Sequence, residues 1–382
     1  MQRIEVDLDH LTHNVEIVKR RLDDKIKTAF VVKADGYGHG MVKVARIGEA
    51  ASLDYLAVSN ISSAKKLREV GITTPVLVFG PIYRGEGSVA EMVDLGVIPT
   101  ITSKSISLPE EMDKKSKSRG VTTKVHLNVD TGMGRTGLFP NEVLPLLKRI
   151  RELRNLKCEG IYSHLSAADS GNSKDRKYTL NQIEEFRQVL LKIDDEGLLP
   201  PLRHLGNSAG FIQYESEVTK PPLNMVRMGS LFYGLPEAEA AWTRELIPTM
   251  SVFTRIAEIR ELPAGSYVGY RRTSRIREDK EVGVLPMGYA DGFNRKMSKN
   301  GEVSVNNQKA PVIGKAPADH ATIDLSKIDM ARVGDRVEIV GRNNSVTELG
   351  KKIGASVLEL VHPFGVKSYE RIYLGDHVDE NY

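Results

Sequence analysis

The chain has 382 residues, of which 40% are hydrophobic and 27% charged, and its formal net charge is +4 at pH 7. This length favours two domains. The charge is mild and no basic stripe interleaved with aromatic residues is present, so we expect no nucleic-acid partner. A single cysteine, Cys158, excludes an internal disulfide and a cysteine-based metal site. The sequence shows no signal segment and no apolar run long enough to cross a membrane, and this predicts a cytoplasmic protein.

Short apolar runs alternate with amphipathic stretches from Lys27 to about Gly234. The runs predicted as strands are 28–32, 55–58, 76–79, 97–101, 124–129, 158–162, 202–205 and 224–227. Helical periodicity between them is clearest over 141–154 and 175–191. Eight strand–helix units in about 200 residues indicate a (β/α)₈ barrel, with a doubly wound sheet as the alternative. We assign residues 1–242 to this domain, the first few being able to pair with the second domain.

The pattern changes beyond Trp242, where helical periodicity thins and β-like runs with Gly, Pro and Asn turns recur. These runs are 249–259, 281–286, 301–305, 311–313, 336–340 and 370–374. They predict a second, mainly β domain over residues 243–382.

Lys33 follows the apolar residues Ala29 to Val32 and precedes a turn of small residues that ends at Gly40. Burying an unpaired ammonium is costly, so this lysine either reaches water or does chemistry. Partial desolvation would lower its pKa, as a lysine that forms Schiff bases requires. Most lysines at strand ends are simply solvated, so the motif alone leaves both readings open.

A barrel would place its chemistry just after the strands, at the carboxyl-terminal face. Arg135, His164, Asn207-Ser208 and Arg227 each follow a different predicted strand. Arg135 ends a glycine-rich turn and offers a planar fork of donors for a carboxylate, although a solvated arginine would fit the turn equally well. His164 has no partner at the spacing of a metal site, so no metal is expected.

Two late strands end in small residues, 206–210 and 227–230, which are predicted to open helices. Free N–H groups at such helix starts form a phosphate cradle, and neighbouring late strands are the usual place for one in barrels. Helix capping by Asn207 or Ser208 would explain the first segment without any ligand.

Together these segments resemble the alanine racemase family, pyridoxal-phosphate enzymes with a barrel and a β domain. The resemblance runs from Ile4 almost to the C-terminus and keeps the family's order. The matching motifs are Val32–Gly40, Asp130–Gly137, Ser163-His164, Asn207-Ser208, Asn224–Arg227 with Tyr233-Gly234, Val268–Tyr270 and Gly288–Gly292.

The resemblance implies pyridoxal 5′-phosphate as cofactor, with Lys33 as its covalent attachment and as one of two acid/base groups. Tyr270 of the partner subunit in a homodimer would be the second, on the opposite face of the cofactor. Arg227 would contact the pyridine nitrogen and keep it unprotonated, because an arginine does not readily give up a proton. His164 would link Tyr270 to Arg227, and Arg135 would contact the phenolic oxygen of the cofactor and the substrate carboxylate.

The resemblance also implies further binding residues. Those expected around the cofactor phosphate are Tyr37, Asn207, Ser208, Gly229 and Ser230. Those expected around the substrate are Arg135, Tyr289, Ala318 and Asp319.

Three positions depart from the family pattern. Asn128 stands where many relatives have a carbamylated lysine, so we expect a small anion, chloride, between Asn128 and Arg135. Pro317-Ala318-Asp319 stands where the family has Cys-Met-Asp, and Ala318 removes volume from the substrate pocket. The terminal segment 366–371 does not align cleanly, and we assign no phosphate-binding tyrosine there.

The resemblance implies a racemase that interconverts L- and D-alanine and supplies peptidoglycan precursors. The alternative is a racemase of serine, of basic amino acids (lysine, ornithine or arginine) or of several substrates. A related decarboxylase of basic amino acids fits less well, because it needs a cysteine in the β domain and Cys158 lies in the barrel. A non-catalytic cofactor-binding protein also fits less well, because such relatives are single barrels without the domain that carries Tyr270.

Overall fold

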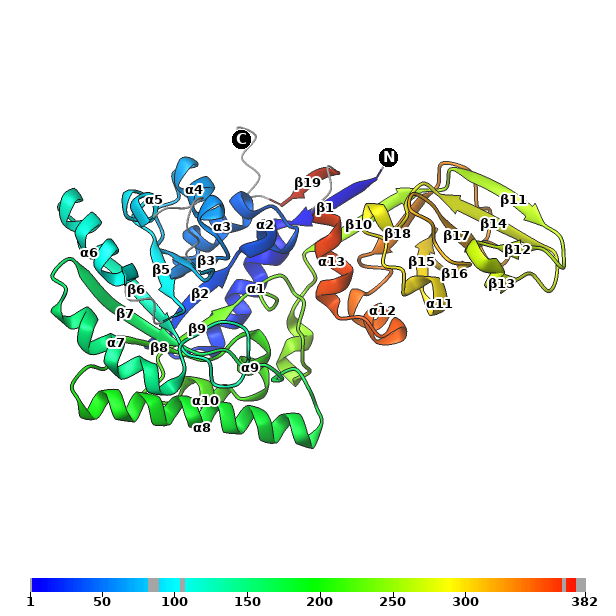
Figure 1. Cartoon of the computed structure of the whole chain (residues 1–382). Coiled ribbons are helices and arrows are strands. Elements are labelled where there is room, and N and C mark those ends of the chain that lie inside the picture. Colours follow the sequence, from blue (N-terminus) through cyan, green and yellow to red (C-terminus); the bar gives the residue numbers. More distant parts are fainter. Residues whose placement is uncertain (1, 82–88, 104–106, 366–368, 376–382) are drawn as a thin grey trace.

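A computed structural model describes residues 2–81, 89–103, 107–365 and 369–375 (Figure 1). In this part of the chain, eight parallel strands close into a barrel. They are β2 (Lys27–Val31), β3 (Tyr55–Val58), β4 (Val76–Val78), β5 (Ile98–Ile101), β6 (Thr123–Asn128), β7 (Leu156–Tyr162), β8 (Leu202–His204) and β9 (Met225–Met228). Each coincides with a predicted run to within two residues at either end, and the expected barrel followed by a mainly β domain is confirmed.

Helices cover the outside of the barrel because their apolar residues recur every three or four positions. In α8 (Ser173–Asp195) the buried positions Thr179, Ile183, Phe186 and Leu190 form such a stripe. The other barrel helices are α1 (Leu8–Arg21), α3 (Met41–Ala50), α4 (Ile61–Glu69), α5 (Val89–Asp94), α6 (Ser107–Arg119), α7 (Pro140–Glu152), α9 (Ser208–Gln213) and α10 (Glu215–Thr219). No helix in the described residues combines the length and apolarity needed to cross a bilayer.

A second sheet contains nine strands of the described chain, in the order β11-β14-β17-β16-β15-β18-β10-β1-β19. They are β1 (Arg3–Asp7), β10 (Met250–Arg255), β11 (Glu258–Leu262), β14 (Lys280–Leu285), β15 (Glu302–Val305), β16 (Gln308–Ile313), β17 (Ala321–Asp324), β18 (Arg336–Val340) and β19 (Glu370–Leu374). The short pair β12 (Tyr267–Val268) and β13 (Ser274–Arg275) lies outside this sheet. Strand β1 is antiparallel to β10 and parallel to β19, so the first residues belong to the second sheet. The division of the chain at residue 242 stays a prediction.

Beside its strands, the second domain contains α11 (Met297–Asn300), α12 (Val346–Ile353) and α13 (Val357–Gly365), and it remains mainly β. Two expectations need correction. The run 249–259 is two strands, because at Ile256 and Ala257 the backbone changes its partner from β18 to β14. Gly229-Ser230 opens hydrogen-bonded turns and not a helix, because the fully buried residues 231–233 cannot all face one side of a helix.

Helix α13 lies between the barrel and the β domain in Figure 1 and packs against the segment that follows β2. Gly365 at its end meets Gly38 so closely that a Cβ on Gly365 would lie 1.9 Å from the Gly38 Cα atom. A Cβ on Gly40 would similarly lie 1.9 Å from the hydroxyl of Tyr373 on β19. These contacts tie the segment that carries Lys33 to the C-terminal end of the chain.

Candidate active site

The segment after β2, α2 (Lys33–Tyr37), is a left-handed turn. The φ angles of Ala34, Asp35, Gly36 and Tyr37 are +53°, +52°, +65° and +54°. A left-handed conformation costs about 1–2 kcal/mol for each residue with a Cβ, so tertiary contacts must stabilise this turn. Strain held in this way is found mainly where a side chain has to be presented in a defined direction.

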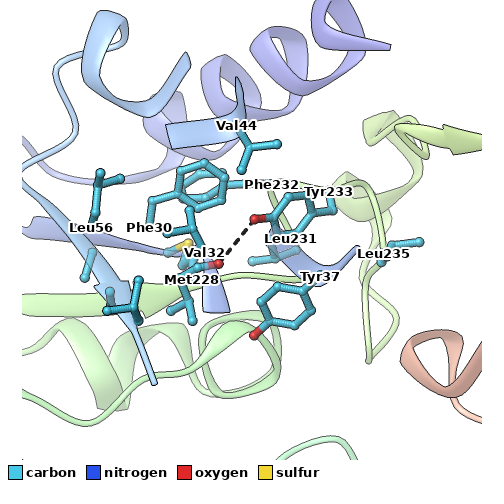
Figure 2. Packing of buried hydrophobic residues seen from close by; sticks show 14 of the residues in the cluster. Phe30, Val32, Tyr37, Val44, Leu56, Met228, Leu231, Phe232, Tyr233 and Leu235 are labelled. Carbon is cyan, nitrogen blue, oxygen red and sulfur yellow. Dashed lines mark hydrogen bonds between the residues drawn. The ribbon is translucent and has the colours of Figure 1, made fainter. Parts of the chain in front are cut away.

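Aromatic packing holds the turn from behind (Figure 2). The ring of Tyr37 lies 5.1 Å from that of Tyr233, which in turn stacks on His39 at 4.5 Å. Phe30 on β2 meets Phe232 edge to face at 4.9 Å, and the Tyr233 hydroxyl donates to the Val31 carbonyl at 3.4 Å. The turn is thus fixed on the apolar core, and the Lys33 side chain reaches the mouth of the barrel.

Lys33 lines a cavity of about 370 Å³ at the carboxyl-terminal face of the barrel. This size is within the range of small-molecule sites. The predicted site residues that line it are Lys33, Tyr37, Arg135, His164, Asn207, Ser208, Arg227 and Gly229, together with Asn128. They come from the ends of five strands, β2, β6, β7, β8 and β9, as a barrel site requires.

Burial lowers the pKa of the Lys33 amine from its usual value, and the charges of Arg135 and Arg227 lower it further. The Glu237 carboxylate opposes this shift. A lowered pKa increases the neutral fraction of the amine at a given pH, and only the neutral amine is a nucleophile or a base.

Arg227 on β9 is buried in the barrel. Its Nη2 group donates to the Ser163 carbonyl at 2.7 Å and to the Leu205 carbonyl at 3.3 Å, and its Nη1 group lies 2.9 Å from Nδ1 of His204. Burial lowers the pKa of Arg227 to about 10, so the guanidinium stays charged at neutral pH. An arginine carries five N–H donors and no acceptor, so donors left over from these contacts can serve a ligand acceptor in the cavity.

His164 lies beside Arg227, with Nδ1 3.4 Å from the arginine Nη2. Burial lowers its pKa to about 3, and Arg227, Arg135 and Lys33 act in the same direction. The ring is therefore neutral at physiological pH. Since Arg227 can only donate, Nδ1 is the acceptor and Nε2 carries the hydrogen of the ring.

The loop that carries Arg135 is shaped by Asp130 and Asn128. The Asp130 carboxylate accepts from the backbone N–H of Gly132 at 2.9 Å and of Gly134 at 3.1 Å. The Asn128 amide donates to the Thr136 carbonyl at 3.0 Å and approaches its hydroxyl at 3.3 Å. Arg135 itself is exposed at the rim of the cavity.

Tyr37, Ser208 and Gly229 converge at one end of the cavity. The Ser208 hydroxyl accepts from the Gly229 N–H at 3.1 Å, and a Cβ on Gly229 would lie 2.6 Å from the Tyr37 hydroxyl. Only a residue without a side chain allows this close approach. Asn207 caps α9 by accepting from the Gly210 N–H at 2.8 Å. It therefore caps the helix and also lines the cavity.

Glu237 and His362 are polar residues of the cavity wall that the sequence analysis did not predict. Glu237 accepts a hydrogen bond of 2.9 Å from Ser230, which itself lies behind the wall, and burial raises the pKa of this carboxyl. His362 on α13 packs its ring edge to face on Tyr37 at 4.6 Å, and its Nε2 atom is buried without a hydrogen-bond partner. A lone histidine in the apolar stretch 357–364 was the available signal for His362, and Glu237 had none.

Tyr369 and Tyr373, the tyrosines on either side of the start of β19, lie elsewhere. Tyr369 donates to the Asp291 carbonyl, and Tyr373 lies against Gly40, so neither lines the cavity. Residues 366–368 of the unassigned terminal segment lie outside the described residues.

The remaining predicted site residues form a second group on the β domain. Tyr289 and Ala290 donate backbone hydrogen bonds to Pro317 and Ala318 at 3.1 and 2.8 Å. Tyr270 follows Gly269, where a Cβ would lie 2.6 Å from the nitrogen of Lys315, close to Ala318 in sequence. The two tyrosines are 67% and 48% exposed, and Asp319 is also exposed. In one chain these residues are not part of the cavity wall.

Two family models cover most of the chain. Residues 6–237 match the N-terminal domain of alanine racemase, and residues 249–373 match its C-terminal domain. The chain is 35% identical to an alanine racemase of Methanococcus maripaludis over 97% of its own length and 98% of that protein. It is 34% identical to an alanine racemase of Halothermothrix orenii, with 94% and 93% covered.

Solved structures agree with this similarity. An alanine racemase from Streptomyces lavendulae superposes with a TM-score of 0.87 at 25% identity, covering 98% of this chain and 97% of that one. One from Clostridium difficile superposes with a TM-score of 0.85 at 28% identity, covering 98% and 96%. The chain belongs to the alanine racemase family.

Membership of the alanine racemase family confirms the expected family and the enzyme class, an amino-acid racemase. Within the cavity, burial and the charges of Arg135 and Arg227 lower the pKa of Lys33.

We expect the Arg135→Gln variant to raise the pKa of Lys33, because it removes a positive charge that disfavours the protonated amine. The measurement is the pH dependence of Lys33 acylation by an amine reagent, followed by mass spectrometry. The midpoint should move to higher pH in Arg135→Gln and stay in place in Arg154→Gln, which alters an exposed arginine at the start of β7. A midpoint unmoved by Arg135→Gln would show that the charge of Arg135 does not lower the pKa of Lys33.

Proposed function

We propose that this protein is a pyridoxal 5′-phosphate-dependent racemase that interconverts L- and D-alanine, with Lys33 and Tyr270 of the partner subunit as its acid/base groups. The observation that carries the proposal is the Lys33 amine, which lines a cavity at the barrel mouth with a lowered pKa. The names of the relatives support alanine as substrate. D-Alanine for peptidoglycan and a cytoplasmic location follow as parts of the proposal.

The residues present fit the cofactor. The cavity has the size of a small-molecule site and a reactive amine on its wall. At one end, the Gly229 backbone closely approaches the Tyr37 hydroxyl and donates to that of Ser208, and these polar groups on the cavity wall suit a phosphate group. The unpartnered Nε2 atom of His362 faces the same region beside Tyr37 and supplies one more polar contact.

Lys33 would hold the cofactor covalently, and Tyr37, Ser208, Gly229 and Ser230 would hold its phosphate, beside Asn207. The bound cofactor supplies an electron-withdrawing ring that makes the Cα proton of the substrate removable. Lys33 would take or return this proton on one face, and Tyr270 of the partner subunit would do so on the other. Removal of a proton from one face by one of these groups, and donation of a proton to the other face by the other group, inverts the configuration at Cα.

Arg227 would face the ring nitrogen and Arg135 the substrate carboxylate. Because Arg227 keeps its proton, the ring nitrogen accepts a hydrogen bond without becoming protonated. This limits electron withdrawal into the ring and suppresses transamination. His164, whose Nε2–H points away from Arg227, is available to Tyr270 of the partner subunit.

The separation of the two residue groups supports a homodimer with shared sites. Tyr270, Tyr289 and Ala318 lie together on the β domain and outside the cavity of their own chain. A two-fold dimer that brings this group to the partner's barrel mouth would complete both sites at once.

The native protein should convert L-alanine to a racemic mixture, measured by chiral chromatography. The Lys33→Ala variant should lose about 10²- to 10⁴-fold in turnover, the usual contribution of an acid/base group. It should also lose the cofactor fixed by borohydride, whereas Lys27→Ala, which alters an exposed lysine at the opposite end of the barrel, should keep both. Cofactor binding without racemisation by the native protein would favour the non-catalytic alternative.

Mixing inactive Lys33→Ala with inactive Tyr270→Phe should restore roughly a quarter of native activity if subunits exchange at random, because one site of each mixed dimer is intact. Mixing Lys33→Ala with Arg227→Gln should restore nothing, because both substitutions lie in the barrel. Equal failure of both mixtures, with exchange demonstrated, would contradict shared sites.

A small anion, chloride, between Asn128 and Arg135 is also part of the proposal. The Asn128 amide donates to Thr136 in the structure, so one of its two N–H groups would turn toward the anion. Crystals soaked in bromide should show the halide there, and turnover should depend on halide in the native enzyme but not in Asn128→Asp. Water alone at this position, together with indifference to halide, would exclude the anion.

Ala318 favours the second candidate function, a racemase of wider range. Alanine in place of methionine frees roughly two to three methylene-sized groups, each worth about 0.8 kcal/mol when buried. We expect measurable kcat/KM for serine, lysine or arginine. In Ala318→Met, kcat/KM for these substrates relative to alanine should fall about tenfold or more, within the ~10- to 200-fold range of discrimination by apolar pockets. An enzyme confined to alanine, or unaffected by Ala318→Met, would make Ala318 a packing variant only.

A further inference from the structure

A row of polar side chains runs through the barrel interior behind Arg227. Barrel interiors are normally filled by layers of branched apolar side chains. Here the row consists of His204 on β8, His126 on β6 and Glu159 on β7, and both histidines are completely buried. We call these three residues the barrel relay.

The relay runs from Arg227 toward solvent. Arg227 Nη1 lies 2.9 Å from His204 Nδ1, and His204 Nε2 lies 2.9 Å from His126 Nδ1. His126 Nε2 faces Glu159 Oε2 at 3.7 Å, a separation wider than a hydrogen bond. Both atoms are buried without a hydrogen-bond partner, so each can satisfy the other after a small approach.

Glu159 has two further neighbours. Its Oε1 atom lies 2.6 Å from the half-exposed Nζ of Lys124, and its carboxylate also interacts with the Tyr55 hydroxyl.

Two local features of β7 create the room and direction for the relay. The pairing of β6 with β7 shifts register so that Val125 opposes Cys158 while His126 opposes Gly160. Glu159 is the extra residue of this bulge, and a bulge re-aims the side chain it carries. Gly160 is required beside it, because a Cβ there would lie 2.5 Å from the ring of His126.

The hydrogen-bond directions follow from Arg227. An arginine only donates, so His204 Nδ1 must accept and its hydrogen must be on Nε2. That Nε2–H donates to His126 Nδ1, which places the His126 hydrogen on the Nε2 atom that faces Glu159. Both rings are then neutral and each is held as a single tautomer.

The electrostatics agree with these directions. Burial lowers the pKa of both histidines, and for His204 the charge of Arg227 adds to the effect. Burial would raise the pKa of Glu159, but the hydrogen bond and charge of Lys124, together with the N–H of His126 that faces the carboxylate, outweigh it and lower the pKa to about 2. Among the described residues no carboxylate lies within ion-pair distance of Arg227, so Glu159 reaches it only through the two rings.

We propose that Glu159, His126 and His204 are positioning residues for the racemase, which hold the guanidinium of Arg227 in one orientation toward the cofactor. The inference rests on the proposed function, because it gives Arg227 the ring nitrogen as its ligand. Each member acts through its neighbour, and none touches the substrate. Loss of a member frees the guanidinium to rotate and weakens its hold on the ring nitrogen.

The first test is direct. Selective ¹⁵N-histidine labelling of the native dimer should show His126 and His204 as neutral Nε2–H tautomers from pH 6 to pH 9, assigned with the variants His126→Gln and His204→Gln. A protonated ring, or an Nδ1–H tautomer at either position, would overturn the relay. This result does not depend on activity, so it separates failure of the relay from failure of the proposed function.

The second test uses the holoenzyme. Glu159→Gln and His126→Leu should lower kcat about tenfold with KM changed less than about twofold, and should raise transamination of the cofactor per turnover about tenfold, the scale of one hydrogen bond to a charged group. His126→Gln keeps one acceptor and one donor and should stay within about threefold of native. The control Glu338→Gln alters a buried carboxylate of the β domain, which accepts from the backbone of Asn343 and Asn344. If Glu159→Gln leaves transamination per turnover unchanged, or if Glu338→Gln changes it equally, the three relay residues contribute packing only.

Discussion

Repulsion among three cations in one small cavity is the constraint around which this site is organised. Lys33, Arg135 and Arg227 line the same space of about 370 Å³, and Glu237 is the carboxylate among its described lining residues. Cations at such distances in a partly desolvated space destabilise one another unless an anion enters or one of them loses its proton. Lys33 is the group that can lose a proton, because burial and then the charges of Arg135 and Arg227 lower its pKa. A bound ligand with a phosphate and a carboxylate would neutralise the excess positive charge of the cavity.

The cavity also depends on the join between the two halves of the chain. The left-handed turn after β2 is stabilised from the barrel side by Tyr233 and from the other side by the close approach of Gly38 and Gly365. Helix α13 then brings Leu358 and His362 over the barrel mouth. A displacement of α13 would therefore move the cavity wall and the turn that holds Lys33 together. The β domain thus supports the barrel site of its own chain as well as carrying the tyrosines assigned to a partner.

The sequence was most informative where one local signal decides the structure. Runs of four or five apolar residues located the barrel strands, because a parallel strand buried on both faces needs no polar alternation. Polar residues directly after those runs, such as Lys33 and Arg227, had to meet at one face once the barrel closed. The same logic could not find His362, because it lies on a helix in a segment whose turns predicted strands. His126 and Glu159 were hidden for another reason: inside a strand, only the register decides which way a side chain points, and a bulge changes it without a sequence signature.

The two groups of site residues complement each other in the chemical groups that they offer. The barrel half offers the cations Lys33, Arg135 and Arg227 and the hydroxyls of Tyr37 and Ser208 proposed to hold the phosphate. The β-domain half offers the exposed phenols of Tyr270 and Tyr289 beside the small residue Ala318. The positive field that favours a neutral Lys33 would equally favour the anionic form of a phenol brought to the same cavity. The same cations would then act on both proton-transfer groups. They would disfavour the protonated amine of Lys33 and stabilise the anionic form of the phenol. The charge of Arg227 would therefore affect more than the ring nitrogen that it contacts. A barrel interior that keeps the guanidinium fixed would influence the protonation of the groups on both faces of the substrate.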